Sequence, residues 1–303
     1  MSIFDLVRAS EITSYWEELS QHQPPYLGEE LWPADKKLGL NLEWIKGANG
    51  LPAVLKPSAF DVGAIPRSRI GFDSLKTQMP FFKESTYIDE EMRQQLNMVI
   101  ETGNSAYTDA VVRRIFDDET RLLSGARARR EEMRMMALTT GAIAITANGQ
   151  NYTYDYGMPD SHKVQVTTSW SDLTNADPVE DLRVWMDMIE ADTGIRPTRG
   201  VCSRKTWGYL RNNQRIIKSL FVLSNGMVGA LSDARLTQYL SDALGLELII
   251  YSKQYLNDQG VATKFVPDEM VSLFPTGNLG KTWFGTTPEE SDLMGGKVAN
   301  VSI

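Results

Sequence analysis

The sequence is poor in the residues that staple a fold or bind metals. Its 303 residues include one cysteine, Cys202, so no intrachain disulfide can form and a secreted disulfide scaffold is excluded. The two histidines, His22 and His162, cannot assemble a two-histidine zinc motif even with Cys202. No apolar run approaches the ~18 residues of a membrane helix, and acids interrupt the first residues where a signal peptide would be apolar. We therefore expect a cytoplasmic protein with no metal, no cofactor and no membrane contact.

Positive charge is scarce as well. Lys and Arg number 31 against 39 Asp and Glu, which gives a net charge of −8 at pH 7. This balance argues against a protein whose main activity is to hold nucleic acid through its phosphates. With 42% apolar and 23% charged residues, the composition is that of an ordinary globular protein, and the length allows one large domain or two smaller ones.

Charge is unevenly distributed over the first 84 residues. Residues 1–35 contain seven acids, three prolines and one basic residue, Arg8, a pattern that favours an arm over a domain. Residues 36–84 begin with a strand-like alternation at 38–45 and then become rich in glycine, proline and basic side chains. Connections this long and irregular are usually functional or reach a partner.

The middle of the chain has stronger local signals. Apolar residues at helical spacing predict one helix from about 106 to 138, roughly 50 Å long at 1.5 Å per residue, which Gly141 would end. A separate helix is expected before it, from about 88 to 103. The pair Asn148-Gly149 between two alternating runs predicts a β-hairpin, and residues 162–168 alternate like a further strand.

Residues 176–270 predict a small unit of alternating helices and strands. The pair Asp177-Pro178 favours the start of a helix that Gly194 ends. Ser203 and Ser232 are suitable caps for two more helices, and short apolar runs between the helices indicate buried strands.

Three motifs contain reactive residue types but lack what the chemistry needs. Residues 275–282 end in Gly-Lys-Thr like a phosphate-binding loop, but Pro275 stands where that loop needs a glycine, and no helix is expected to follow. Asp160-Ser161-His162 are adjacent, so we expect a surface turn instead of a catalytic triad. Cys202 is expected to be a small core residue.

The predicted long helix carries a mixture of charges. Between residues 105 and 140, seven basic side chains accompany six acids, a balance that favours ion pairs and protein contacts over phosphate binding. The consecutive acids 117–119 point to different sides of a helix and do not form a metal site. No catalytic, cofactor-binding or metal-ligating residue is therefore expected, and we expect that the protein is not an enzyme.

One segment resembles a known family. Residues 246–285 contain a buried strand, two tyrosines four residues apart, an Asn-to-Gly turn and a Lys-Phe-hydrophobic-Pro-Asp step before a glycine-rich turn, formed by Tyr251, Tyr255, Asn257, Gly260, Lys264, Phe265, Pro267, Asp268 and Gly277. This pattern resembles the lambda-type major capsid protein family of tailed phages, also called capsid protein E. The order of the predicted elements extends the resemblance over nearly the whole chain.

The resemblance implies an α+β fold, the Hong Kong 97-type fold of tailed-phage major capsid proteins. In that fold an N-terminal arm and an extended loop reach neighbouring subunits, a peripheral domain carries a long spine helix, and an axial α/β domain meets its copies around the capsomer axis. The regions implied here are an arm at 1–35, an extended loop at 36–84, a peripheral domain at 85–175, an axial domain at 176–285 and a C-terminal return at 286–303.

The resemblance also implies a function. The chain would self-assemble, as pentamers and hexamers, into the icosahedral head that encloses the double-stranded DNA of a phage without sequence-specific binding. It would assemble in the bacterial host cytoplasm and reside in the virion. The chain shows no long N-terminal scaffolding-type extension, so a separate scaffolding protein is expected, together with a portal and a possible decoration protein.

Contacts between subunits are expected at exposed aromatic and basic residues of the arm, the loop and the spine helix: Trp16, Trp44, Lys56, Arg67, Arg69, Arg127 and Arg130. We expect the acidic arm to pair with the basic loop or the spine helix of a neighbour. Two alternatives stay open. One is an encapsulin-like nanocompartment shell of the same fold, and the other is a cytoplasmic α/β enzyme.

Overall fold

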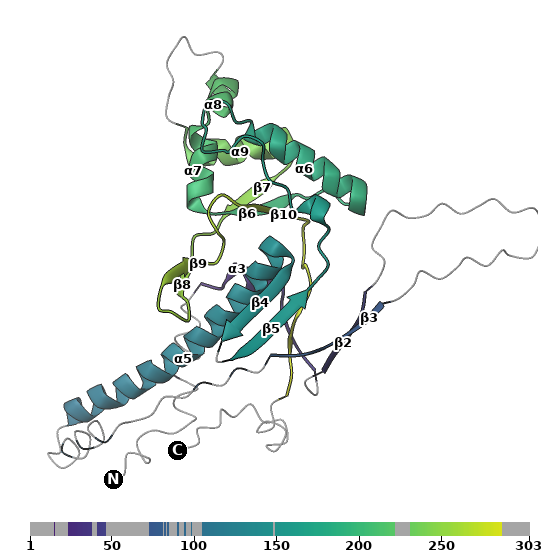
Figure 1. Cartoon of the computed structure of the whole chain (residues 1–303). Coiled ribbons are helices and arrows are strands. Elements are labelled where there is room, and N and C mark those ends of the chain that lie inside the picture. Colours follow the sequence, from purple (N-terminus) through teal and green to yellow (C-terminus); the bar gives the residue numbers. More distant parts are fainter. Residues whose placement is uncertain are drawn as a thin grey trace, which may run out of the picture. The chain divides into compact units, whose positions relative to one another are not determined.

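The structure is a computed structural model that describes residues 15, 24–37, 41–46, 73–80, 82, 84, 90, 94, 98, 105–147, 149–221 and 231–286. The chain divides into two compact units, and Figure 1 labels its helices and strands. The first unit contains Met1–Asn41, Gln78–Glu132 and Thr282–Ile303. The second unit contains Leu42–Thr77 and Met133–Lys281.

The longest element is helix α5, Ser105–Thr140, whose residues up to Glu132 belong to the first unit. It confirms the long helix predicted at 106–138. Gly141 follows α5 with a φ of 73°, a left-handed conformation that glycine adopts without strain. Most of the helix predicted at 88–103 lies outside the described residues.

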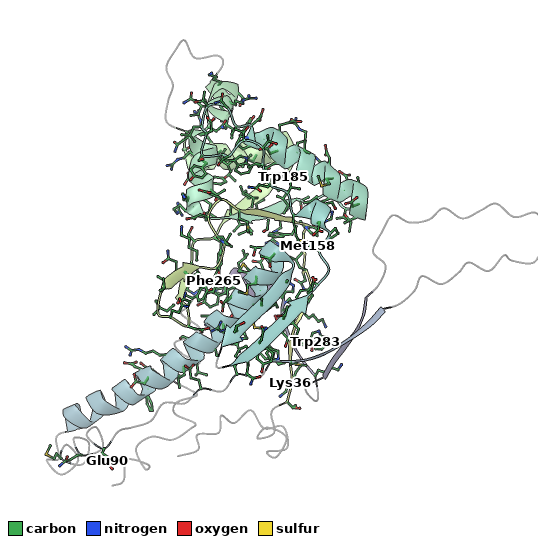
Figure 2. The ribbon with its side chains drawn as sticks, viewed as in Figure 1. Lys36, Glu90, Met158, Trp185, Phe265 and Trp283 are labelled. Carbon is green, nitrogen blue, oxygen red and sulfur yellow. The ribbon has the colours of Figure 1, made fainter. Side chains whose placement is uncertain are left out.

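Short elements from both ends of the sequence meet in the first unit. Helix α3, Leu27–Leu31, precedes strand β1, Ala34–Lys36. Strand β11, Thr282–Phe284, pairs with β1 in parallel, with Ala34 opposite Thr282 and Lys36 opposite Phe284. Lys36 and Trp283 mark this pair in Figure 2. The pair therefore joins segments that are about 250 residues apart in the sequence.

Two further two-stranded sheets are formed by strands that are closer together in the sequence. Strands β2, Asn41–Lys46, and β3, Asp73–Gln78, pair with each other at the two ends of the predicted loop region, and β2 confirms the strand expected at 38–45. Strands β4, Ala142–Ala147, and β5, Gln150–Asp155, form the predicted antiparallel hairpin, with Gly149 at a φ of 74° in its turn.

The rest of the second unit is a three-stranded sheet with helices. Its sheet has the order β10-β6-β7, in which β6 is parallel to β7 and antiparallel to β10. Strands β8 and β9 form a separate antiparallel hairpin. The elements are α6 Pro178–Thr193, β6 Arg199–Cys202, α7 Arg204–Asn212, α8 Gln214–Phe221, α9 Asp233–Leu244, β7 Glu247–Ile250, β8 Gln254–Leu256, β9 Ala262–Lys264 and β10 Val271–Phe274.

Helix caps form where the sequence predicts them. The Asp177 side chain accepts a hydrogen bond from the backbone N–H of Glu180, and Ser203 and Ser232 accept equivalent bonds at the starts of α7 and α9. Gly194 and Gly245 end α6 and α9 at φ values of 75° and 67°. The predicted α/β unit is therefore confirmed in its helices and in its main strands.

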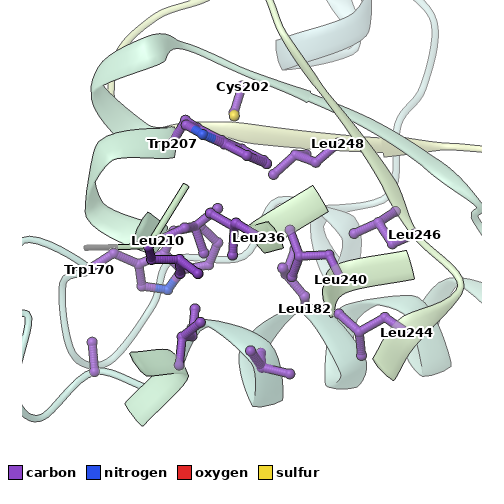
Figure 3. Packing of buried hydrophobic residues seen from close by; sticks show 14 of the residues in the cluster. Trp170, Leu182, Cys202, Trp207, Leu210, Leu236, Leu240, Leu244, Leu246 and Leu248 are labelled. Carbon is purple, nitrogen blue, oxygen red and sulfur yellow. The ribbon is translucent and has the colours of Figure 1, made fainter. Parts of the chain in front are cut away.

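The helices and the sheet enclose one apolar cluster (Figure 3). Leu182 of α6, Leu210 of α7, Leu236 and Leu240 of α9 are fully buried, and Trp207 is 2% exposed. Each such side chain contributes about 1.5–3 kcal/mol on removal from water. This cluster gives the second unit a rigid core.

One predicted strand is wrong. Residues 162–168 were expected to form a strand from the alternation of Val164 and Val166, but the structure has a single turn of 3₁₀ helix, Asp160–His162, followed by irregular backbone. Val166 packs against the apolar cluster while Val164 is exposed. The alternating burial therefore occurs in irregular backbone. None of the described strands pairs with this segment, so it does not become a strand.

Candidate functional site

The N-terminal segment is held on helix α5 by an ion pair and a buried hydrogen bond. Arg127 donates from Nε and Nη2 to the Glu29 carboxylate at 3.1–3.3 Å. One turn further along α5, the carboxylate of Glu131 accepts a bond of 3.0 Å from the backbone N–H of Gly28. Glu131 is fully buried, so this bond lies away from water. We call these contacts, with Tyr26, the anchor.

Tyr26 completes the anchor through its ring and its backbone. The Arg127 guanidinium carbon lies 5.5 Å from the centre of the Tyr26 ring, within cation–π range. The Tyr26 backbone N–H donates to Glu29 at 3.2 Å, as in a capping box. Burial raises the pKa of the Tyr26 phenol above its usual value, and the charge of Arg127 partly opposes that shift. The phenol therefore stays neutral at physiological pH.

The C-terminal strand is attached beside the anchor. The Arg130 guanidinium carbon lies 5.3 Å from the Phe284 ring centre. The backbone N–H of Thr282 donates to the carbonyl of Pro33, and its hydroxyl donates to the carbonyl of Trp32, both at 2.9 Å. Helix α5 thus holds the segment before residue 37 and strand β11 together.

A further contact lies nearer the start of α5. The Tyr15 hydroxyl donates to Asp117 at 3.0 Å, and the Tyr15 and Phe116 rings lie 5.5 Å apart. Tyr15 pairs with residues 116–117 and Glu29 pairs with Arg127, so the two contacts come in the same order along both segments. Such contacts can position a segment that leaves the helix.

The structure describes the surroundings of two predicted contact residues. Arg127 and Arg130 bind segments of their own chain, as described above. Trp44 lies in β2. Trp16, Lys56, Arg67 and Arg69 lie outside the described residues. A contact with another subunit stays a prediction for all seven.

Sequence reasoning missed the partners of these arginines. Glu29 is 98 residues from Arg127, and Gly28 is 103 residues from Glu131. The one available signal was charge, because an acidic segment and a helix with basic residues were both evident. Glu29 and Arg127 pair within one chain, and the pairing of the acidic arm with a neighbour stays a prediction.

The residues that carry the family resemblance form a cluster in the second unit. The Phe265 ring stacks on Tyr255 at 4.8 Å and lies 6.2 Å from Tyr251. Lys264 binds both oxygens of Asp268 at 2.7 and 2.8 Å, and the Ser203 hydroxyl donates to Asp268 at 2.6 Å. These bonds, first that from Lys264 and then that from Ser203, hold the pKa of Asp268 below its usual value. The motif therefore fixes hairpin β8–β9 and the start of α7.

The structure describes the surroundings of each of the three motifs that contain reactive residue types. Burial raises the pKa of the Cys202 thiol to about 12, so the reactive thiolate does not form at neutral pH. The Nε2 atom of His162 lies 2.9 Å from the carboxylate of Asp192, which belongs to helix α6. Ser161 lies in the same 3₁₀ turn as His162. Strand β11 follows Lys281, where a phosphate-binding loop would be followed by a helix.

Two further chemistries can be assessed over the described part of the chain. Among the residues in that part, no group of three or more His, Cys, Asp or Glu side chains is placed to hold a metal ion. None of the helices in the same part is both long enough and apolar enough to cross a membrane.

None of the curated proteins matches the chain. A crystal structure assigned to a prophage capsid protein of Escherichia coli CFT073 is similar, with 19% identity and a TM-score of 0.46, over 71% of this chain and 61% of that one. The chain thus spans about three fifths of that relative's length.

A second similar crystal structure is a phage-related protein of Bordetella bronchiseptica RB50. It has 12% identity and a TM-score of 0.46, and the match covers 86% of this chain and 76% of that one. The family model described as phage major capsid protein E matches residues 8–301. This match covers nearly all of the sequence, and the chain therefore belongs to the phage major capsid protein E family.

Proposed function

We propose that the chain is the subunit of a tailed-phage head, and that it self-assembles into the icosahedral shell around double-stranded DNA. The family match over residues 8–301 carries this proposal, since the family is a structural one whose members build capsids. The subunit would assemble in the host cytoplasm and reside in the virion. Its net charge of −8 favours a shell that encloses DNA without binding it tightly.

The proposed fold is of the Hong Kong 97 type. Helix α5, with 36 residues and a length of about 54 Å, would be the spine helix of a peripheral domain at 85–175, and hairpin β4–β5 would belong to its long sheet. Residues 1–35 would be the arm, 36–84 the extended loop, 176–285 the axial domain and 286–303 a return to the peripheral domain.

The anchor supports a role for α5 as the base from which the arm departs. Its ion pair is mostly shielded from water, with the Arg127 side chain 12% and the Glu29 side chain 28% exposed. A fixed departure point lets an arm reach the same place on every neighbour, which a closed shell of identical subunits requires. Pentamers and hexamers of this chain, a separate scaffold, a portal and a possible decoration protein are the partners of the proposal.

Negative-stain microscopy and sedimentation of the purified full chain, alone and with a co-expressed scaffold, test the proposed function. Closed shells, tubes or capsomer rings are expected. Reversal of Arg67 and Arg69 to glutamate should reduce particle yield, since both are proposed contact residues. A monomer under both conditions would contradict the proposal, and a shell that co-purifies with a cargo enzyme would indicate a nanocompartment instead.

A further inference from the structure

The C-terminal end of helix α6 exposes acidic and apolar side chains together. Asp187, Glu190 and Asp192 are all exposed there. Ile195, just beyond the helix, is 58% exposed, and Val184, one turn before Asp187, is 48% exposed. We call these five residues the acidic end. Exposed apolar side chains within a charged rim are typical of a surface that another protein covers.

The acids of this end oppose the helix dipole. A helix carries partial negative charge at its C-terminus, so acids there are unfavourable and basic residues favourable. The last turn of α6 contains no basic residue. Arg196, just beyond the helix, binds Asp187 at 2.5 Å and Glu190 at 2.6 Å. These two carboxylates raise the pKa of Arg196, yet one guanidinium does not balance the acids and the dipole together.

Helices α7 and α8 have the opposite charge. Between residues 204 and 221 there are five basic side chains and no acid, and all five are exposed. We call them the basic face: Arg204, Lys205, Arg211, Arg215 and Lys218. Three of them form ion pairs with acids from other elements, Lys205 with Glu269, Arg211 with Asp233 and Arg215 with Asp177.

The acidic end and the basic face lie far apart within the second unit. Arg215 binds Asp177, the residue that caps the N-terminus of α6, at 2.9 Å. At 1.5 Å per residue, Asp187 and Glu190 lie about 15 and 20 Å along α6 from that contact, and the end of the helix lies about 24 Å from it. Figure 1 shows α7 and α8 on one side of this unit and the end of α6 on the other. The two charged surfaces therefore cannot satisfy each other within one chain.

We propose that the acidic end of one subunit docks on the basic face of a second copy of the chain. The inference rests on the proposed function and adds the surfaces by which neighbours recognise each other. Two different patches meet in such a contact, so the contact is head-to-tail, and repeated head-to-tail contacts generate rings when the rotation closes. The positive charge of the second copy also compensates the C-terminal dipole of α6. Val184 and Ile195 become covered in the same step.

Charge-altering variants of the full chain test this contact. The variant Asp187→Asn/Glu190→Lys raises the charge of the acidic end by three, and Arg215→Gln/Lys218→Glu lowers the charge of the basic face by three. Each variant alone should lose association by on the order of tenfold or more near 0.1 M salt. An equimolar mixture of the two should regain part of it, because the unaltered acidic end of one variant can then meet the unaltered basic face of the other. The chain that carries all four substitutions should not regain it, because its acidic end no longer carries net negative charge.

Two controls separate this contact from a general effect of charge. Asp242→Lys alters an exposed acid in the last turn of α9, and Arg183→Glu makes α6 more acidic, so both should assemble like the wild type. Thermal unfolding checks that each variant is folded, and the milder Glu190→Gln replaces a variant that is not. If the wild type assembles and both charge variants assemble equally well, the inference is overturned while the proposed function stands. A wild type that never assembles overturns the proposed function.

Discussion

The two units are stabilised by different interactions. The second unit packs leucines and tryptophans from α6, α7, α9 and the sheet into one apolar cluster. The first unit attaches short elements to α5 through Arg127, Glu29, Glu131 and Arg130. Apolar packing tolerates little change in volume, whereas charged hydrogen bonds fix direction with little buried area. A packed core therefore stabilises the second unit, and directed polar contacts attach the short elements of the first unit.

The small size of the elements in the first unit explains why charged contacts and not a core attach them. Helix α3 has five residues, and β1 and β11 have three each. Leu31 is fully buried, but elements this short present too few apolar side chains to form a core. Charged hydrogen bonds contribute about 1.5–3 kcal/mol per bond and fix direction as well. Charged hydrogen bonds can therefore hold a short element in one specific position although little surface is buried.

The largest effect is expected for truncation inside the apolar cluster. Leu210→Ala removes a fully buried side chain and should lower the free energy of unfolding of the second unit by about 2–5 kcal/mol. Leu256→Ala is the matched control, since Leu256 is 72% exposed and its loss should change that free energy by less than about 0.5 kcal/mol. Urea unfolding followed by tryptophan fluorescence measures both.

The same pair of variants tests whether the two units unfold separately. Hydrogen exchange of the Gly28 amide, which donates to Glu131, reports on the anchor. Its protection should be similar in Leu210→Ala and in the wild type at low denaturant. Equal losses at Gly28 and in the cluster would mean that the two units unfold as one, and the comparison would fail.

A smaller effect is expected for the anchor. Arg127→Ala removes two donors to Glu29 and the contact with Tyr26, so local opening of the N-terminal segment should become easier by roughly 1–2 kcal/mol. Hydrogen exchange of the Gly28 amide and proteolytic cleavage within residues 24–37 measure this opening, and both should become faster. Unfolding of the second unit should be unchanged.

Two variants control the anchor experiment. Arg121→Ala removes an arginine that is 82% exposed and whose ion pair with Asp118 is long, at 3.5 Å. Such an exposed pair contributes little, so hydrogen exchange at Gly28 should stay as in the wild type. Arg127→Lys keeps the charge but loses the forked geometry, and should be intermediate. Identical exchange in all three variants would show that the ion pair contributes nothing to the attachment.

Sequence patterns predicted what depends on neighbouring residues. Helix α5, the β4–β5 hairpin and the caps of α6, α7 and α9 all follow from residues within a few positions of each other. Capping and turn residues act through their own backbone, so a single sequence contains the whole signal. The resemblance to capsid protein E also came from one local segment, and the family match confirms it.

Contacts between distant residues were not predictable in the same way. Nothing local in residues 34–36 indicates that they pair with 282–284, and nothing near Arg127 names Glu29 as its partner. The failed strand at 162–168 has the same origin, because alternation shows which side chains are buried but not whether another strand is available. Pairing depends on the whole chain and needs the structure.

The smallest effect is expected at Asp268, where charge fixes a loop on the rigid unit. Bonds from Lys264 and Ser203 lower the pKa of Asp268 in the folded state below the ~3.9 of an unfolded chain. The ionised carboxylate therefore stabilises the fold above about pH 4, and this contribution is lost as pH falls through the lowered pKa.

The variant Asp268→Asn should lower the free energy of unfolding by no more than about 1 kcal/mol at pH 7. The difference from wild type should shrink below about pH 4. Urea unfolding at pH 7, 5 and 3 measures it, with Asp242→Asn as the control for charge. A pH-independent difference would show that Asp268 acts through shape alone.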